Sequence, residues 1–145
     1  MKKRIQIAKT APAAYKAMLD IEKYLEKSGL DKTLYELIKT RASQINGCAY
    51  CLNMHTRDAL KWGESPQRLF LLDAWRETDL YSDKEKAALA LTESITCIKE
   101  GNVPDDVYEQ AAAHFSEKEL AAVIMAVVAI NAWNRISIAT RTPLD

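Results

Sequence analysis

The sequence has few of the residues that interrupt helices, with four glycines and four prolines among 145 residues. These residues fall between segments whose apolar side chains recur at helical spacing. The sequence also lacks a stretch that alternates apolar and polar residues as a half-buried strand would, and it lacks tandem repeats and linkers. We therefore predict an all-α chain with short connections that forms a single domain over residues 1–145.

The net charge is zero, because 20 lysine and arginine residues balance 20 aspartate and glutamate residues. Such a chain has no basic field to hold nucleic acid or an anionic membrane. The longest apolar run, residues 121–130, is well short of the about 20 residues that a membrane-spanning helix needs. The basic start at Met1 to Arg4 is not followed by the apolar segment of a signal peptide. We expect a cytoplasmic protein without a nucleic-acid or membrane partner.

Helix-start and helix-stop residues predict about seven helices. Glycines that favour a helix end mark the ends of the first three, at Gly29, Gly47 and Gly63. A Ser-x-x-Glu capping box, in which the two side chains satisfy exposed amides, begins two later helices. The expected starting residues are Pro12, Asp31, Cys48, Ser65, Ser82, Pro104 and Ser116.

The last predicted helix is unusual, because from Leu120 to Trp133 it is apolar nearly all the way round. A helix of this kind is buried on every side. It is either a central core helix or a helix covered by a partner subunit, and the sequence leaves both alternatives open.

The chain has only three cysteines and two histidines, and three of these five residues lie in the segment from Cys48 to His55. At about 100° per residue in a helix, Cys48, Cys51 and His55 share one narrow sector. A helix N-terminus favours the reactive thiolate at Cys48, whereas His55, one turn beyond Cys51, can accept the proton of Cys51. The pattern indicates thiol redox chemistry, but the residues alone do not decide which thiol attacks.

Two other interpretations of this cluster stay open. Cys48, Cys51 and His55 could form a metal-binding module, although a structural zinc site needs a fourth ligand. Alternatively, the thiols could act as a redox switch in a non-catalytic oligomer. The remaining thiol and imidazole, Cys97 and His114, do not form a second paired motif, and we interpret them as a core residue and a helix-end residue.

The segment from Glu36 to His55 resembles the alkylhydroperoxidase D-like (AhpD-like) branch of the carboxymuconolactone decarboxylase family. The signature of this branch is a glutamate, eleven residues, C-x-x-C, three residues and a histidine, and Glu36, Cys48, Cys51 and His55 fill these places. Residues 71–77, 85–90 and 130–135 are also similar to this branch. The resemblance implies an all-helical domain that assembles into homotrimers or homohexamers. It further implies a peroxidase that reduces hydroperoxides through a cysteine pair, without a metal or a cofactor.

The resemblance also implies a role for each site residue. Cys51 would be the peroxidatic thiol and Cys48 the resolving thiol, with His55 and Glu36 as the proton relay. A dithiol protein, lipoylated or thioredoxin-like, would reduce the pair again. Tyr50 departs from the best-known members, which carry a second histidine there, and a phenol with a pKa of about 10 is a poor base near neutral pH. The lactone chemistry of the decarboxylase branch is a weaker alternative, because that branch does not rely on a cysteine pair.

Some further residues have both a structural and a functional interpretation. Periodicity alone places Glu36 on a solvated helix face, whereas the family pattern predicts that another helix or subunit covers it. Asn131, Asn134 and Arg135 either pack a subunit interface, with Arg135 in an ion pair, or support the active site. Trp62 lies on the cysteine side of its helix and is a candidate for the pocket wall.

Overall fold

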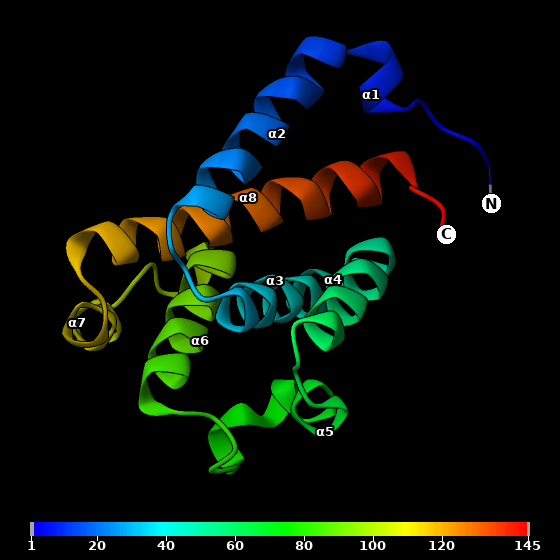
Figure 1. Cartoon of the computed structure of the whole chain (residues 1–145). Coiled ribbons are helices and arrows are strands. Elements are labelled where there is room, and N and C mark those ends of the chain that lie inside the picture. The colour runs from blue at the N-terminus through cyan, green and yellow to red at the C-terminus, as the bar shows by residue number, and fades with distance from the viewer. Residues whose placement is uncertain (1, 145) are drawn as a thin grey trace.

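The computed structural model describes residues 2–144, and this part of the chain is helical without a strand. The all-α prediction is confirmed, and the seven predicted helices correspond to α2 to α8 (Figure 1). The structure adds one short α-helix and two 3₁₀ helices. The elements are α1 (Ile7–Thr10), α2 (Pro12–Lys27), α3 (Lys32–Asn46), α4 (Ala49–Lys61), α5 (Pro66–Phe70), η1 (Leu72–Glu77), α6 (Asp83–Thr96), η2 (Ile98–Glu100), α7 (Asp105–His114) and α8 (Glu117–Thr140).

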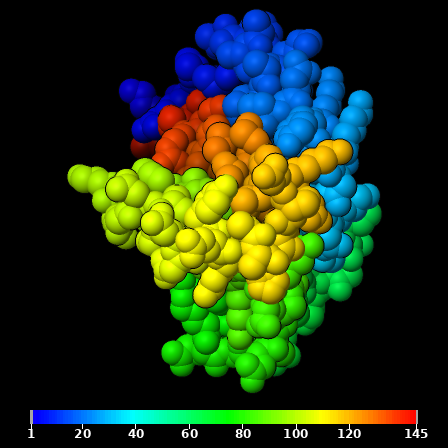
Figure 2. All heavy atoms as spheres, turned by 90° about the vertical axis from the view of Figure 1, so that its left-hand side faces the viewer, coloured from blue at the N-terminus to red at the C-terminus, as the bar shows by residue number. Residues whose placement is uncertain are grey.

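Helices α3 and α8 form the centre of the bundle. Helix α3 packs against α4, α6 and α8, and α8 also contacts α2 and α7 (Figure 1). Helix α2 leans over α8 on the opposite side from α3 and α4. On the face turned toward the viewer in Figure 2, α7 and the start of α8 lie between α2 above and the 65–90 region below. The two ends of the chain lie on the same side of the molecule in Figure 1.

Capping contacts confirm several of the predicted helix starts. Asp31 accepts a hydrogen bond from the Leu34 amide at 3.0 Å and so begins α3. Both Ser-x-x-Glu boxes form, with Ser82 at the start of α6 and Ser116 at the start of α8. Each box satisfies two amides that a helix start leaves without a partner.

The prediction of one continuous helix starting at Ser65, the fourth predicted helix, is wrong. The segment divides into α5 and η1, and Ala74 inside η1 has non-helical backbone angles, with φ of −108° and ψ of 26°. The turn aims Trp75 inward, where its indole Nε1–H donates to Glu93 Oε1 at 2.8 Å. Because a buried indole N–H needs an acceptor, this long-range contact competes with local helical continuity.

Helix α8 packs at the centre of the bundle, as the core-helix alternative predicts, and its cover by a partner subunit stays a prediction. Val123, Val127 and Ile130 are fully buried in it, whereas Val128 and Ile138 are exposed. Its 24 residues are long and apolar enough to cross a membrane by composition alone. The helices packed around it account for the same composition, because a core helix of this length is apolar on most sides.

Candidate active site

The junction between α3 and α4 presents the cysteine pair. Gly47 ends α3 with a φ of 68°, a left-handed conformation that glycine adopts without the steric cost of a Cβ. Cys48 then caps α4, and its Sγ accepts the backbone N–H of Cys51 at 3.3 Å. The tight junction therefore sets both sulfurs at the N-terminus of α4.

Cys48 and Cys51 are joined in a disulfide, with their Cα atoms 5.3 Å apart. Both residues are about 1% exposed. Of the two, Cys51 lines the large cavity described below. The joined sulfurs offer no thiolate to a metal, so the alternative module at Cys48, Cys51 and His55 would require the reduced pair.

Glu36 and His55 form a buried hydrogen bond between α3 and α4. His55 Nδ1 lies 2.7 Å from Glu36 Oε2, and both residues are 5% exposed. The polar face of α3 is therefore covered by α4, as the family pattern predicts. The carboxylate fixes the orientation of the imidazole and leaves Nε2 as its second nitrogen. Such a pair can hold or move a proton beside the cysteines.

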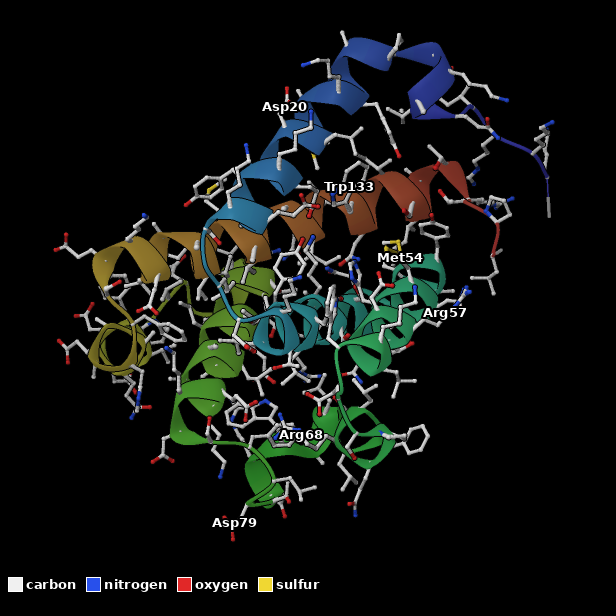
Figure 3. The ribbon with its side chains drawn as sticks, in the orientation of Figure 1. Asp20, Met54, Arg57, Arg68, Asp79 and Trp133 are labelled. Atoms are coloured by element: carbon white, nitrogen blue, oxygen red, sulfur yellow. A yellow bond between two sulfur atoms is a disulfide. The ribbon has the colours of Figure 1, made fainter. Side chains whose placement is uncertain are left out.

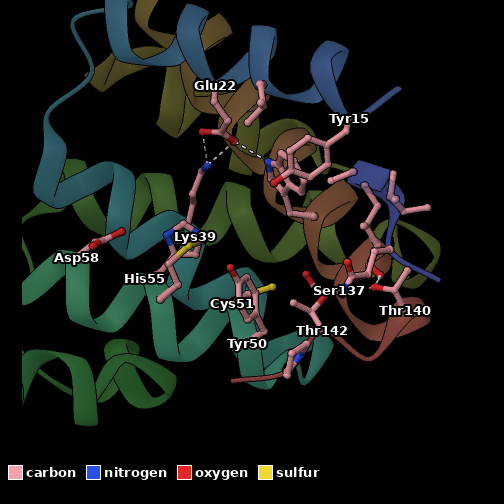
Figure 4. Close-up of a pocket in the computed structure, with 18 of the residues that line it drawn as sticks. Tyr15, Glu22, Lys39, Tyr50, Cys51, His55, Asp58, Ser137, Thr140 and Thr142 are labelled. Carbon is pink, nitrogen blue, oxygen red and sulfur yellow. Dashed lines mark hydrogen bonds and ion pairs between the residues drawn. The ribbon is translucent and has the colours of Figure 1, made fainter. Parts of the chain in front are cut away.

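A cavity of about 1230 Å³ lies in front of Cys51 (Figure 4). Its walls come from the N-terminal segment, α2, α3, α4 and the second half of α8. The apolar part of the lining includes Tyr15, Leu19, Leu25, Met54, Trp133 and Ile136. Tyr50, Trp62, Glu36 and His55 also line it, so the cavity brings together all predicted site residues except Cys48.

A second polar cluster, which no sequence pattern predicted, lines the same cavity. Lys39 is only 2% exposed, and its Nζ donates to both oxygens of Glu22, at 2.6 and 2.7 Å. The Glu22 carboxylate also accepts from the Tyr35 hydroxyl and, at 2.9 Å, from Trp133 Nε1. Figure 4 shows this cluster on one side of the cavity, with Tyr50 and Cys51 on another, and Figure 3 shows Trp133 on α8, next to α2.

The cluster shifts the pKa values of its members. Burial by itself would raise the pKa of Glu22, but the Lys39 ammonium and the three donors outweigh it and hold this pKa below its ordinary value. Burial lowers the pKa of Lys39, and the Glu22 charge offsets this only in part. Burial and the bond to Glu22 raise the pKa of Tyr35. The carboxylate is therefore the charge that the cluster stabilises most clearly.

An asparagine network supports the junction from behind. Asn46, the last residue of α3, donates to Asn131 Oδ1 at 3.0 Å and to Asn134 Oδ1 at 2.9 Å. Asn134 in turn donates to Ser43 Oγ at 3.0 Å. These bonds tie α8 to the end of α3, directly before the cysteine pair. Arg135 makes no ion pair within residues 2–144 and donates to Asn131, and its packing against a partner subunit stays a prediction.

The remaining thiol and imidazole lie away from the cavity. Cys97 caps the end of α6 and lines a separate, smaller pocket with Arg41 and Glu93. Burial raises the pKa of this thiol, which disfavours the reactive thiolate. His114 is exposed at the end of α7.

Asp58 lies beside the Glu36–His55 pair, and the sequence interpretation did not single it out. It lies on α4 one turn after His55, and its carboxylate lies within 4.8 Å of ligand atoms of both Glu36 and His55. A spacing of three residues in a helix brings two side chains to one face, and this was the available signal.

Comparisons with known proteins agree with this fold. Residues 11–94 match the model of the carboxymuconolactone decarboxylase family. The chain is 48% identical over 139 residues to the uncharacterized protein YdfG of Bacillus subtilis, a match that covers 96% of this chain and 95% of that protein.

Solved structures extend the comparison. ATU0492 of Agrobacterium tumefaciens, a protein of unknown function suggested to be the antioxidant defence protein AhpD, has a TM-score of 0.95 and 42% identity, covering 99% of both chains. An uncharacterized peroxidase-related protein from Silicibacter has a TM-score of 0.79 and 22% identity, covering 90% of this chain and 69% of that one, and so shares the fold. By family model, relative and structure, the chain belongs to the AhpD-like branch of the carboxymuconolactone decarboxylase family.

Proposed function

We propose that this protein reduces hydroperoxides with the Cys48–Cys51 pair. The observation that supports this most directly is the buried hydrogen bond between Glu36 and His55, one helical turn from Cys51 and on the same cavity. A thiol with a pKa of about 8.5 is mostly protonated at neutral pH, whereas peroxide reduction needs the thiolate. A base at this position can remove the thiol proton and so generate the thiolate.

The proposed reaction begins with the reduced pair. His55 Nε2 takes the proton of Cys51, and the Glu36 carboxylate stabilises the resulting imidazolium through Nδ1. The Cys51 thiolate attacks the terminal oxygen of the hydroperoxide, the O–O bond breaks, and the alkoxide takes a proton from His55 to leave as an alcohol. Cys51 is then a sulfenic acid.

Resolution closes the disulfide. The Cys48 sulfur attacks the Cys51 sulfenic sulfur, and hydroxide leaves as water after taking the Cys48 proton. A dithiol protein then reduces the disulfide by two successive exchanges, and its own thiols become a disulfide. Because both cysteines are about 1% exposed, this donor must reach the pair through the cavity that Cys51 lines.

The assignment of Cys51 as the attacking thiol has support from its position. Cys51 lines the cavity and precedes His55 by one turn. Cys48 Sγ instead accepts an amide at the helix start. A sulfur on the cavity wall is the one that a bound peroxide can meet. Tyr50, between the two cysteines and partly exposed in the cavity, is placed to donate a hydrogen bond to a peroxide or an alkoxide.

The test uses reduced protein and one equivalent of cumene hydroperoxide. We expect mass spectrometry to show the loss of two hydrogen atoms and a peptide cross-linked through Cys48 and Cys51. The Cys48→Ser variant should stop at a sulfenic acid on Cys51, which a dimedone probe traps. Cys51→Ser should lose the fast reaction, whereas the matched control Cys97→Ser should keep it.

Turnover is measured with a dithiol donor present. Sustained peroxide consumption supports an enzyme. One stoichiometric oxidation without turnover by any dithiol protein would instead indicate the redox-switch alternative. Equal reaction rates for Cys51→Ser and the wild type would overturn the proposal.

A further inference from the structure

Asp58 has no task in the reaction proposed above, yet it lies against the relay. The ligand atoms of Glu36, His55 and Asp58 lie within 4.8 Å of one another. Glu36 Oε2 lies 2.7 Å from His55 Nδ1, and the Glu36 side chain is only 6% exposed. Two carboxylates and an imidazole thus converge on one place at the wall of the cavity.

We propose that Glu36, His55 and Asp58 form an inhibitory zinc site. Nitrogen and oxygen ligands bind Zn²⁺ at about 2.0–2.2 Å, which places tetrahedral ligand atoms about 3.4 Å apart. The ligand atoms of the three groups lie within 4.8 Å of one another, so they have to draw closer together to hold the ion. Two carboxylate charges offset the charge of the ion, and the cavity leaves the fourth position open to water.

Zinc would occupy the place of the proton shared by His55 and Glu36. The ion takes the Nδ1 lone pair, and the neutral imidazole then carries its proton on Nε2. Lys61, whose ammonium lies 3.1 Å from Asp58 Oδ1, has to give up this contact. Its side chain is 71% exposed, and an exposed ion pair of this kind contributes little.

The consequence for catalysis rests on the proposed function. Nε2 is the nitrogen that accepts the Cys51 proton in that reaction. With zinc on Nδ1, Nε2 already holds a proton, so the relay cannot deprotonate Cys51. Zinc binding itself requires only the three side chains and is independent of the peroxidase activity.

The decisive experiment titrates ZnCl₂ into the disulfide form of the protein by isothermal calorimetry. In this form Cys48 and Cys51 have no thiolate, so their zinc affinity does not contribute. A Cys97→Ser background removes the remaining thiol. We expect one zinc per chain, with the affinity reduced more than about tenfold in Asp58→Asn and lost in His55→Gln, because even loss of a residue behind a zinc ligand costs about 10- to 100-fold.

His114→Gln is the matched control, because it removes the only other histidine and should bind zinc as tightly as the parent. X-ray absorption at the zinc edge of this variant should show one imidazole among oxygen ligands, and that imidazole can come only from His55. This measurement does not depend on the folding of the other variants. Absence of zinc binding, or binding that depends on His114 and not on Asp58, would overturn the proposal.

A second experiment measures peroxide reduction. Zinc should inhibit the wild type, and Asp58→Asn should keep its basal rate and resist inhibition. Equal inhibition of both proteins would show that zinc acts through the reduced thiols, against the proposal. If neither protein reduces peroxide, the proposed function fails, while calorimetry on the disulfide form still decides the zinc site.

Discussion

At the scale of single residues, the orientation of His55 depends on one carboxylate. Glu36 accepts from Nδ1 at 2.7 Å from within the bundle, where water competes little for the hydrogen bond. The charge of the carboxylate matters as well as its position, because an imidazolium forms when His55 takes a proton. Glutamine preserves the shape of this group and removes the charge.

We therefore expect Glu36→Gln to slow Cys51 oxidation by about 100-fold near pH 7, in line with the usual contribution of a positioned proton acceptor. The rate should recover as the pH rises past about 8.5, where a thiol ionises without assistance. Stopped-flow measurement with cumene hydroperoxide across this pH range checks both expectations. Glu26→Gln, an exposed glutamate on the same cavity, is the control and should react like the wild type. A loss in Glu36→Gln that stays constant with pH would contradict the relay.

Single residues were also the scale at which the sequence was least informative. Glu36 was identified only through the family pattern, because helical periodicity placed it on a solvated face. Neither Lys39 nor Glu22 drew a prediction from the sequence, since nothing local distinguishes a buried lysine from an exposed one. Their pairing joins residues 17 positions apart on different helices. A contact of this kind depends on how two helices pack against each other, and a single sequence does not show which helices pack together.

At the scale of elements, the α3–α4 junction decides how the cysteines meet. Gly47 has a φ of 68° and open space around the place where a Cβ would be. An added methyl group would therefore cost backbone strain of about 1 kcal/mol rather than a clash. That strain would act directly on Cys48, the next residue.

We expect Gly47→Ala to lower the free energy of unfolding by about 1 kcal/mol and to slow disulfide closure after peroxide addition. Gly29→Ala is a matched control, because Gly29 also has a positive φ, 79°, and open space but lies far along the chain from the cysteines. It should lose similar stability and keep the rate of closure. Urea denaturation and quenched mass spectrometry provide the two measurements. Equal rates of disulfide closure in both variants would show that the α3–α4 junction does not control how the two cysteines meet.

Elements were the scale at which the sequence was most informative. Asp31, Gly47 and the two serine boxes act within one helical turn, so their effect is readable from neighbouring residues. The break at Ala74 was missed because its cause, the bond from Trp75 to Glu93, spans 18 residues. The family pattern anticipated that another helix or subunit covers Glu36, but periodicity predicted only which face of α3 is polar.

At the scale of the whole molecule, the Glu22 carboxylate ties α2 to the rest of the bundle. Its bonds reach Tyr35 and Lys39 on α3 and Trp133 on α8. Removing one partner of a buried ion pair leaves the other charge without compensation, which is strongly destabilising. Assembly into trimers or hexamers, by contrast, remains a prediction from the family resemblance.

We expect Lys39→Met to lower the free energy of unfolding by about 3–5 kcal/mol, and the double variant Glu22→Gln/Lys39→Met to recover part of the loss. The control, Lys16→Met, breaks the exposed pair with Asp20 and should cost at most about 1 kcal/mol. Chemical denaturation of the four proteins checks this. A double variant no more stable than Lys39→Met would show that the loss of stability comes from altered packing and not from the unpaired Glu22 carboxylate.

Acid stability should change in the same variant. Glu22 has a lowered pKa in the folded protein, so its contribution is complete above its ordinary value of 4.5 and is lost as the pH falls through the folded value. Without Lys39, burial dominates and raises this pKa. Protonation of Glu22 then favours the folded state, so Lys39→Met should lose less stability than the wild type when urea denaturation is repeated as the pH falls through about 4.5.

The position of the chain ends has a practical consequence for biochemists. Residues 2–8 and 141–143 both line the cavity, and Arg4 Nη1 donates to the Ala139 carbonyl at 2.7 Å. A peptide fused to either end would begin beside the cavity in which we propose that the reaction takes place. Purification tags on this protein are therefore best removed before assay, because they would act as an obstruction and be mistaken for low intrinsic activity.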